Sequence, residues 1–427
     1  MPLDQRESLD RRIDARTDAL VELTRELIRI PTVNPPGDGY RACAELIGDR
    51  LAGRGFQVEY VRAQGTPGDS DLHPRTNVVA RIAGGRPGPC VHFNGHIDVV
   101  AAGGGWTVDP FAGEVREGRV YGRGAADMKG GLAAAIIAVE SILESGIGFP
   151  GAIEISGTVD EESGGFGGVA YLAERGHFSR PRVDHVIIPE PLNVDRVCIG
   201  HRGVWWAEIE TRGRAAHGSM PFLGVCAVRH MGVVIERIER DLVPRLSRRR
   251  TSMPVVPEGA RQSTININSI HGGLREDYEG LPSPVVPDRC RMVIDRRYLI
   301  EEEPAEVRRE IVDILEALAR ERPNFAWGLQ ELLAFQPTMT DANAPVSRAL
   351  SAEIERVLGR AASHVVSPGT YDQKHIVRIG QLKDCVAYGP GILDLAHQPD
   401  EYVVIEDMVN SAKVMAGATL HLLGVAP

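Results

Sequence analysis

The sequence predicts an α/β fold, in which a larger domain contains a mostly parallel sheet with helices on both faces and a smaller α+β domain is inserted into it. In the first 200 residues, short apolar segments alternate with helical patterns, which is typical of buried parallel strands covered by helices. After Gly200 the pattern changes to strands and helices with their own turns. The chain has 427 residues, 43% hydrophobic and 25% charged, as expected for a globular protein of two or three domains.

The larger domain begins with a helix predicted over residues 14–30, where Ile, Leu and Val recur at helical spacing until Pro31. The turn-rich segment TVNPPGDG follows, and a second helix is predicted over residues 42–51. Strands and helices then alternate. The predicted strands cover residues 77–82, 90–94, 152–158 and 185–188, and the predicted helices cover 131–143 and 169–175.

The inserted α+β domain is predicted over residues 201–318, which leaves residues 1–200 and 319–427 for the larger domain. The insertion has the pattern of half-buried strands at 205–210, 264–270 and 292–298, and helices are predicted after Val225 and Pro304. The apolar pattern of helix and strand returns at about residue 343 and ends with residues 405–423.

Charge and cysteine usage exclude several classes of protein. The 48 Lys plus Arg against 58 Asp plus Glu give a net charge of −10, and we therefore expect no nucleic-acid partner. We also expect no membrane partner, because no secretory signal and no apolar run of bilayer length is found. The six cysteines are far apart and form no Cys-x-x-Cys pair, which favours a reducing, cytoplasmic location. Any metal site must therefore use His and carboxylate ligands.

Two motifs follow or precede buried segments in the first part of the chain. VHFNGHIDVV places His96 and Asp98 two residues apart after an apolar strand, so that both side chains can face one site. On its own this pair is a weak signal. GRGAADMKGG places Asp127 among glycines at the start of an Ala-rich helix. Asp127 could be a helix N-cap, or its two carboxylate oxygens could bridge two cations.

Three further motifs place acids and a histidine near strand ends. Glu161 and Glu162 follow the strand GAIEISGTVD, and Glu190 ends the apolar segment HVIIPE. His397 lies in the turn AHQPDEYV. Each could be a solvated loop residue, but the carboxyl ends of strands are where α/β enzymes place their functional groups. Six of these residues together supply what a two-metal hydrolase needs, namely nitrogen and oxygen ligands, a bridging acid and a base. They are His96, Asp127, Glu161, Glu162, Glu190 and His397.

The order of these motifs, with AHGSMP and GPG between them, resembles the di-zinc family of acetylornithine deacetylase, succinyl-diaminopimelate desuccinylase, aminoacylase and carboxypeptidase G. The resemblance extends from about residue 20 to the end. It implies that His96 and Glu190 bind one metal, that Glu162 and His397 bind the other, and that Asp127 bridges them. It also implies that Asp98 orients His96, that Glu161 is the general base, and that the Asp127–Met128 peptide bond is cis.

The same resemblance implies that residues 201–318 form a lid and dimerisation domain of a homodimer, and that the rest is the metal-binding catalytic domain. His217, in GRAAHGSMP, matches the family histidine that polarises the scissile carbonyl, often from the partner subunit. Arg297, in IDRRYL, resembles the family arginine near the substrate carboxylate, with Arg296 beside it as the alternative. The implied reaction is hydrolysis of a C–N bond by metal-activated water, with Glu161 as general base.

The sequence departs from the family pattern in three places. Pro284, after the loop LREDYEGLPS, and Cys226, in GVCAV, stand where asparagine is common in the family. The loop SPGTYDQKH carries larger residues than most members have there. We therefore expect that loop to contribute substrate-binding residues, namely Tyr371, Lys374 and His375, for a larger or aromatic carboxylate-bearing small molecule.

The leading hypothesis is a metal-dependent deacylase of N-acyl amino acids or related small amides. One alternative is an aminohydrolase that releases ammonia from a substituted aminobenzoate. A dipeptidase or carboxypeptidase and a non-catalytic ligand-binding relative are the others. The ligand types suit Zn²⁺, Co²⁺ or Mn²⁺, with one or two ions per subunit.

Overall fold

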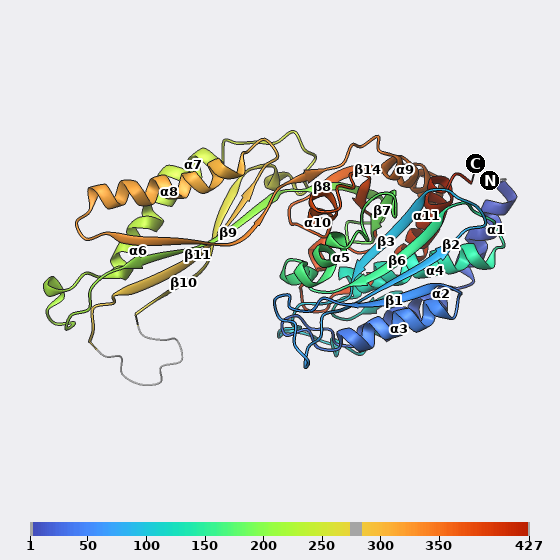
Figure 1. Cartoon of the computed structure of the whole chain (residues 1–427), viewed down its shortest axis with the longest axis horizontal. Coiled ribbons are helices and arrows are strands. Elements are labelled where there is room, and N and C mark those ends of the chain that lie inside the picture. The colour runs from blue at the N-terminus through green and yellow to red at the C-terminus, as the bar shows by residue number, and fades with distance from the viewer. Residues whose placement is uncertain (1–2, 274–283, 426–427) are drawn as a thin grey trace. The chain divides into compact units, whose positions relative to one another are not determined.

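The computed structural model describes residues 3–273 and 284–425 (Figure 1). The chain divides into two compact units. The first comprises Met1–Gly200, Met339–Val365 and Tyr371–Pro427, and the second comprises His201–Thr338 and Val366–Thr370. The loop LREDYEGLPS, one of the predicted departures from the family, lies outside the described residues.

The main sheet has a parallel centre, as the sequence predicts. Its strand order is β1-β2-β6-β3-β7-β15-β8-β13, and β14 pairs with β8. The parallel strands are β3 (Cys90–His96), β6 (Ala152–Thr158), β7 (His185–Ile188) and β15 (Cys385–Ala387). The outer strands are β1 (Gln57–Arg62), β2 (Thr76–Ala83), β8 (Arg196–His201), β13 (Thr338–Met339) and β14 (Ser363–Ser367). Antiparallel pairing of β1 with β2, and of β2 with β6, extends one side.

Helices cover both faces of this sheet. Every residue of β3 and β6 is buried, as a sheet covered on both sides requires. Gly95 of β3 faces Leu132 of α4, whereas its neighbour Asn94 donates a hydrogen bond to Asp372 at the start of α10 on the other face. The helices of the first unit are α1 (Leu3–Asp14), α2 (Thr17–Arg29), α3 (Tyr40–Ala52), α4 (Gly130–Glu144), α5 (Tyr171–Glu174), α9 (Pro345–Leu358), α10 (Gln373–Arg378) and α11 (Ile405–Leu422). The α/β fold class is therefore confirmed.

A small antiparallel sheet lies beside the entrance to α4. It consists of β4 (Glu114–Arg116), β5 (Arg119–Tyr121) and β16 (Tyr402–Val404) in the order β16-β5-β4. Tyr402 pairs with Tyr121, and the backbone N–H of Gly122 donates to the carbonyl of Glu401 at 2.9 Å. This sheet therefore holds the C-terminal segment next to the glycine-rich segment that precedes α4.

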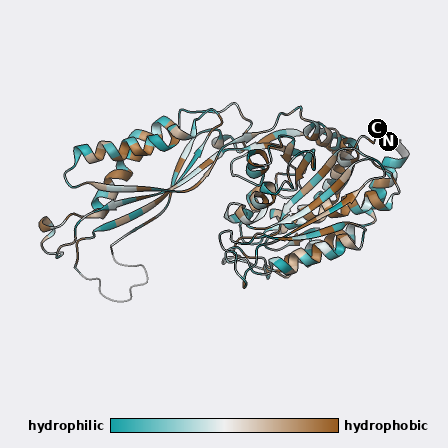
Figure 2. Ribbon diagram, in the orientation of Figure 1, coloured by the Kyte–Doolittle hydropathy of each residue, from teal (hydrophilic) through white to brown (hydrophobic). Residues whose placement is uncertain are grey.

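The second unit is built on a four-stranded antiparallel sheet in the order β10-β11-β9-β12. The strands are β9 (Gly203–Arg212), β10 (Thr264–Gly272), β11 (Arg289–Tyr298) and β12 (Ala326–Phe335), and the helices are α6 (Ala227–Arg237), α7 (Val243–Leu246) and α8 (Pro304–Glu321). Hydrophobic and hydrophilic residues alternate along α8 in Figure 2, and its buried face includes Val307, Ile311 and Leu315. This apolar face packs into one core with Met292 and Ile294 of β11.

The second unit continues beyond residue 318, because β12 pairs with β9 along most of its length. The predicted domain division at residues 200 and 318 remains a prediction, and the compact unit comprises His201–Thr338 and Val366–Thr370. The six cysteines all lie among the described residues, and none of them forms a disulfide there. Among the described residues, the helices lack the combination of length and apolar character that crossing a membrane requires.

Candidate metal centre

The first group of ligand-type side chains forms beyond the carboxyl ends of β3 and β7. His96 is the last residue of β3, Glu190 follows β7, and Asp127 lies in the turn η1 (Ala125–Lys129) before α4. The Nε2 atom of His96 is 3.0 Å from Oδ1 of Asp127 and 4.0 Å from Oε1 of Glu190. One ligand-type atom of each residue lies within 4.8 Å of those of the other two, close enough to hold a metal ion.

The second group shares Asp127 with the first. The Nε2 atom of His397 is 3.1 Å from Oε1 of Glu162 and 3.5 Å from Oδ2 of Asp127. In this group too, one ligand-type atom of each residue lies within 4.8 Å of those of the other two. The two oxygens of Asp127 therefore face different imidazoles, with Oδ1 toward His96 and Oδ2 toward His397. The peptide bond between Asp127 and Met128 is cis, as the resemblance implies.

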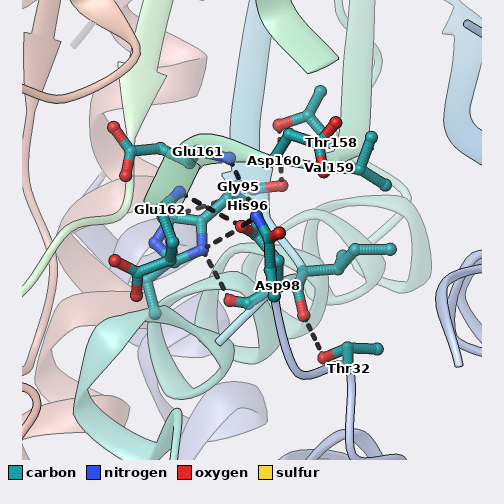
Figure 3. Close-up of polar contacts among 12 residues, drawn as sticks. Thr32, Gly95, His96, Asp98, Thr158, Val159, Asp160, Glu161 and Glu162 are labelled. Carbon is teal, nitrogen blue, oxygen red and sulfur yellow. Dashed lines mark hydrogen bonds and ion pairs between the residues drawn. The ribbon is translucent and has the colours of Figure 1, made fainter. Parts of the chain in front are cut away.

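Asp98 holds the backbone of the Glu161–Glu162 turn, as Figure 3 shows. Its carboxylate accepts the N–H groups of Glu161 and Glu162, both at 3.1 Å, and the side-chain amide of Asn34 at 3.0 Å. The contact with His96 is made mainly by the backbone, because Nδ1 of His96 donates to the carbonyl of Asp98 at 2.9 Å. The Asp98 carboxylate is farther away, 3.6 Å from the same nitrogen. Fixing Nδ1–H in this way leaves the Nε2 lone pair of His96 for a cation.

Glu161 is paired with a buried lysine. The Nζ atom of Lys374, in α10, donates to Oε1 of Glu161 at 2.6 Å. The Lys374 side chain is 2% exposed and that of Glu161 is 11% exposed. A charge-assisted hydrogen bond of this length fixes the orientation of the carboxylate.

The electrostatics of the two groups reflect several acids in a small buried volume. Burial raises the pKa of Glu190 well above its usual value, and the negative charge of Asp127 adds to this effect. Burial raises the pKa of Glu162 to about 7, although a hydrogen bond from His397 opposes the shift. Hydrogen bonds to Asp127 and Glu162 raise the pKa of His397 to about 10. For Asp127, burial opposes ionisation, but hydrogen bonds from His397 and His96 hold its pKa below the usual value.

The remaining residues predicted in the first unit contact protein groups. Tyr371 is buried, and its hydroxyl donates to Oε1 of Gln373 at 3.0 Å. His375 is also buried, with Nε2 2.6 Å from the carbonyl of Gly164. Both side chains thus support the loops that carry Glu161 and Lys374.

His217 and Arg297 belong to the second unit. His217 is exposed, and its Nδ1 accepts the backbone N–H of Ser219 at 3.2 Å, so that the proton of a neutral ring lies on Nε2. Arg297 is bound to Asp295 through two hydrogen bonds of 2.8 and 3.0 Å, with a side chain 22% exposed. Arg296, in contrast, is fully buried against Glu302 and Glu310. Of the two arginines, only Arg297 is accessible to a ligand.

Two supporting residues were not singled out from the sequence. Asn34 binds both Asp98 and Ser163, and Glu401 contacts the segment that carries Asp127. The sequence offers only a weak signal for each. Asn34 lies in the turn-rich segment TVNPPGDG, and Glu401 follows His397 by four residues.

Comparisons with known proteins identify the family and the fold of the chain. Residues 92–421 match the model of peptidase family M20/M25/M40. The chain is 30% identical to a succinyl-diaminopimelate desuccinylase of Marinobacter nauticus, over 94% of this chain and 98% of that one. It is 32% identical to the enzyme of the same name from Methylobacterium nodulans, over 92% and 93%.

The fold is similar to the crystal structure of human carnosine dipeptidase 1, with a TM-score of 0.79 and 19% identity, covering 99% of this chain and 100% of the other. Apart from Val91, the first residue of VHFNGHIDVV, all the motifs on which the resemblance rests lie within residues 92–421. The chain therefore belongs to peptidase family M20/M25/M40, and it is a metal-dependent hydrolase that acts on C–N bonds.

Proposed function

We propose that the protein holds two divalent cations, one in each group of the metal centre. His96, Asp127 and Glu190 hold the first cation, and Asp127, Glu162 and His397 hold the second. The observation that supports this most directly is that the two oxygens of Asp127 face imidazoles of different groups. One imidazole and two carboxylates for each ion suit Zn²⁺, Co²⁺ and Mn²⁺ alike.

We assign the proton transfers to Glu161. When bound, the cations supply Lewis acidity and lower the pKa of a nearby water molecule. Glu161 accepts the proton of that water and later donates it to the leaving nitrogen. Lys374 holds Oε1 of Glu161, and we therefore propose Oε2 as the atom that carries the proton. Asp98 supports the same residue by fixing its backbone N–H.

His217 and Arg297 are proposed to act on the substrate from the second unit, His217 from its own or the partner subunit. The tautomer of His217 places its proton on Nε2, from which it can donate to the oxygen of the scissile carbonyl as negative charge develops. Arg297 has the most exposed side chain of the four predicted substrate-binding residues, and a guanidinium is well suited to bind a carboxylate. For Tyr371, Lys374 and His375, direct contact with the substrate remains a prediction.

We propose N-acyl amino acids as the substrate class. The two relatives reported above, each matched over more than nine-tenths of this chain, are named as desuccinylases. Dipeptides are the second candidate, because the same groups can hydrolyse either kind of amide bond and the fold is that of a known dipeptidase.

The test is an activity panel with protein depleted of metal by a chelator and then reconstituted with Zn²⁺, Co²⁺ or Mn²⁺. The panel contains N-succinyl and N-acetyl amino acids, dipeptides and substituted aminobenzoates. We expect metal-dependent release of a free acid and an amine from the N-acyl amino acids. Release of ammonia from the aminobenzoates alone, or activity on dipeptides alone, would contradict the proposed substrate class.

Two further predictions concern the state of the protein. We propose that it is a homodimer, and its mass in solution, measured by analytical ultracentrifugation, tests this. A mass near the 46.4 kDa of one chain would contradict the dimer. The cytoplasmic location also remains a prediction, which fractionation of the source cells would test.

A further inference from the structure

Glu401 is a buried acid that contacts the segment carrying Asp127. Its Oε1 accepts two consecutive backbone N–H groups, from Ala126 at 2.9 Å and from Asp127 at 3.1 Å. The residue is 1% exposed. A carboxylate oxygen that accepts two neighbouring amides fixes the position and orientation of the peptide between them.

The other oxygen of Glu401 is held just as firmly. Oε2 accepts a hydrogen bond from Arg123 at 2.5 Å, and Arg123 is 2% exposed. Arg123 also donates to the carbonyls of Ala102 and Gln398, at 3.1 and 3.3 Å. The position of Glu401 is therefore fixed, because both of its oxygens are bound and Arg123 is itself held by the separate loop of Ala102 and by Gln398, three residues before Glu401.

The arrangement repeats what Asp98 does on the other side of the centre. Asp98 accepts the N–H groups of Glu161 and Glu162, and Glu401 accepts those of Ala126 and Asp127. In both cases a buried acid holds the backbone of a segment whose side chains reach the centre. Burying a carboxylate is costly unless hydrogen bonds compensate, so the repetition favours a specific role for both residues.

We propose that Glu401 is a positioning residue for Asp127, through which it sets the geometry of both groups of the metal centre. The proposal rests on the proposed function, in which Asp127 is the ligand shared by two cations. Glu401 itself binds no cation and does not contact the substrate. Outer-shell partners of metal ligands commonly change metal affinity by about 10- to 100-fold when they are removed, and this is the effect we expect.

A rival explanation is that Glu401 only holds the turn of His397, which lies four residues before it in the chain. The two explanations differ when His397 is absent. In His397→Ala, the group of His96, Asp127 and Glu190 still binds a cation through Asp127. If Glu401 acts through Asp127, Glu401→Gln weakens the binding of this remaining cation as well. If Glu401 only holds the turn of His397, Glu401→Gln has no further effect on cation binding in this background.

The experiment measures the affinity for Co²⁺ by its visible absorption and by competition with a chelator, without reference to activity. Wild type, Glu401→Gln, His397→Ala and the double variant are compared. We expect Glu401→Gln to weaken binding of both ions in the wild-type background by about 10- to 100-fold. We expect a loss of similar size for the remaining ion in the His397→Ala background.

The matched control is Glu353→Gln. Glu353 is another buried glutamate, 1% exposed, and it is ion-paired with Arg6 and Arg356 away from the centre. It should alter thermal stability but leave Co²⁺ affinity unchanged. If Glu401→Gln does not fold, Glu401→Asp replaces it with the same expectation, because it withdraws the carboxylate by one methylene.

The outcomes separate the inference from the proposed function. If the wild-type protein binds no divalent cation, the proposed function fails. If the wild type binds two ions and Glu401→Gln binds them equally well, only the inference fails. The inference also fails if the effect disappears in the His397→Ala background, or if Glu353→Gln weakens binding as much as Glu401→Gln does.

Discussion

The two ends of strands β3 and β6 carry buried acids with opposite electrostatic behaviour. At the amino end, Glu154 lies opposite His92 in the parallel register and also binds Arg81 and Arg182. Burial opposes ionisation of Glu154, but hydrogen bonding with His92 and the charge of Arg182 lower its pKa to about 2. At the carboxyl end, burial instead raises the pKa of Glu162, which follows β6, and of Glu190, which follows the neighbouring strand β7.

The difference is one of charge balance rather than burial. Glu154 has two guanidinium groups and an imidazole as neighbours, so the cluster is compensated by the chain itself. At the other end, Asp127 lies close to Glu190 and His96 in one group and to Glu162 and His397 in the other, so that three acids share two imidazoles. A buried acid cluster short of positive charge is characteristic of a functional site, whereas a compensated one contributes to stability. Substitutions at the two ends should therefore affect different properties.

The largest expected effect is on catalysis, at Glu161. Glu161→Gln should lower kcat by about 10²- to 10⁴-fold, the range typical of losing a general acid or base. Because Glu161 is not one of the proposed ligands, the affinity for Zn²⁺ should remain close to that of wild type. Steady-state kinetics on the best N-acyl amino acid, with metal content measured in parallel, checks this. Turnover of the variant at the wild-type rate would exclude Glu161 as the base.

The opposite result is expected for Glu154→Gln, which should lower stability and leave kcat nearly unchanged. The pKa of Glu154 is about 2 in the folded protein, whereas its ordinary value is 4.5. The difference between these two pKa values corresponds to about 3 kcal/mol of unfolding free energy at neutral pH. Because the folded-state pKa is the lower one, this contribution is present above pH 4.5 and is lost as the pH falls toward 2.

The stability difference between wild type and Glu154→Gln should therefore be constant above about pH 5 and shrink below it. Urea unfolding at several pH values measures this. An equal difference at pH 3.5 and pH 7 would show that the contribution does not come from the charge of Glu154. A large loss of kcat in Glu154→Gln at pH 7 would contradict the expectation that the amino end contributes to stability and the carboxyl end to catalysis.

The third test is metal removal, which should change the unfolding temperature only through the metal centre at the carboxyl end. A cation that binds only the folded state stabilises it by about 2.7 kcal/mol when its concentration is 100 times the dissociation constant. We expect Zn²⁺ to raise the unfolding temperature of wild type and of Glu154→Gln by similar amounts. In Asp127→Asn the increase should be much smaller. An equal increase in Asp127→Asn would contradict its role as the shared ligand.

The smallest expected effect concerns Lys374, which brings a fixed positive charge to the carboxyl end. If Lys374 orients Glu161, Lys374→Met should lower kcat by about tenfold with little change in KM, as is common for outer-shell partners. If Lys374 also binds the substrate carboxylate, as predicted from the sequence, KM should rise instead. Lys374→Arg serves as the conservative control. Unchanged kinetics in Lys374→Met would exclude both roles.

The sequence predicted the parallel centre of the sheet better than its edges. The predicted strands at 152–158 and 185–188 coincide with β6 and β7, and the apolar run of β7 is typical of a strand buried on both faces. Strand β1 was not predicted, since most of its residues are exposed and it lacks such a run. Strand β12 was also missed, because its partly exposed residues do not alternate regularly.

At the centre, residues with unusual chemistry at strand ends could be picked out, and the structure brings His96, Asp127, Glu162, Glu190 and His397 into two groups. Residues that act through the backbone could not. Glu401 and Asn34 contact the N–H groups or side chains of distant segments, and Glu401 is 274 residues from Asp127. Such contacts depend on tertiary structure and therefore cannot be predicted from local sequence patterns.

The separation of these residues along the chain also determines when the centre can form. His96 and His397 belong to the same centre, yet the whole second unit is synthesised between them. Contacts between residues so far apart form late, because a long loop must close first. On the ribosome, the group of His96, Asp127 and Glu190 is synthesised by residue 190, whereas the group of His397 needs about 207 further residues, which include the second unit. Under the proposed function, a cation in the group of His397 would therefore report that the second unit has already been synthesised.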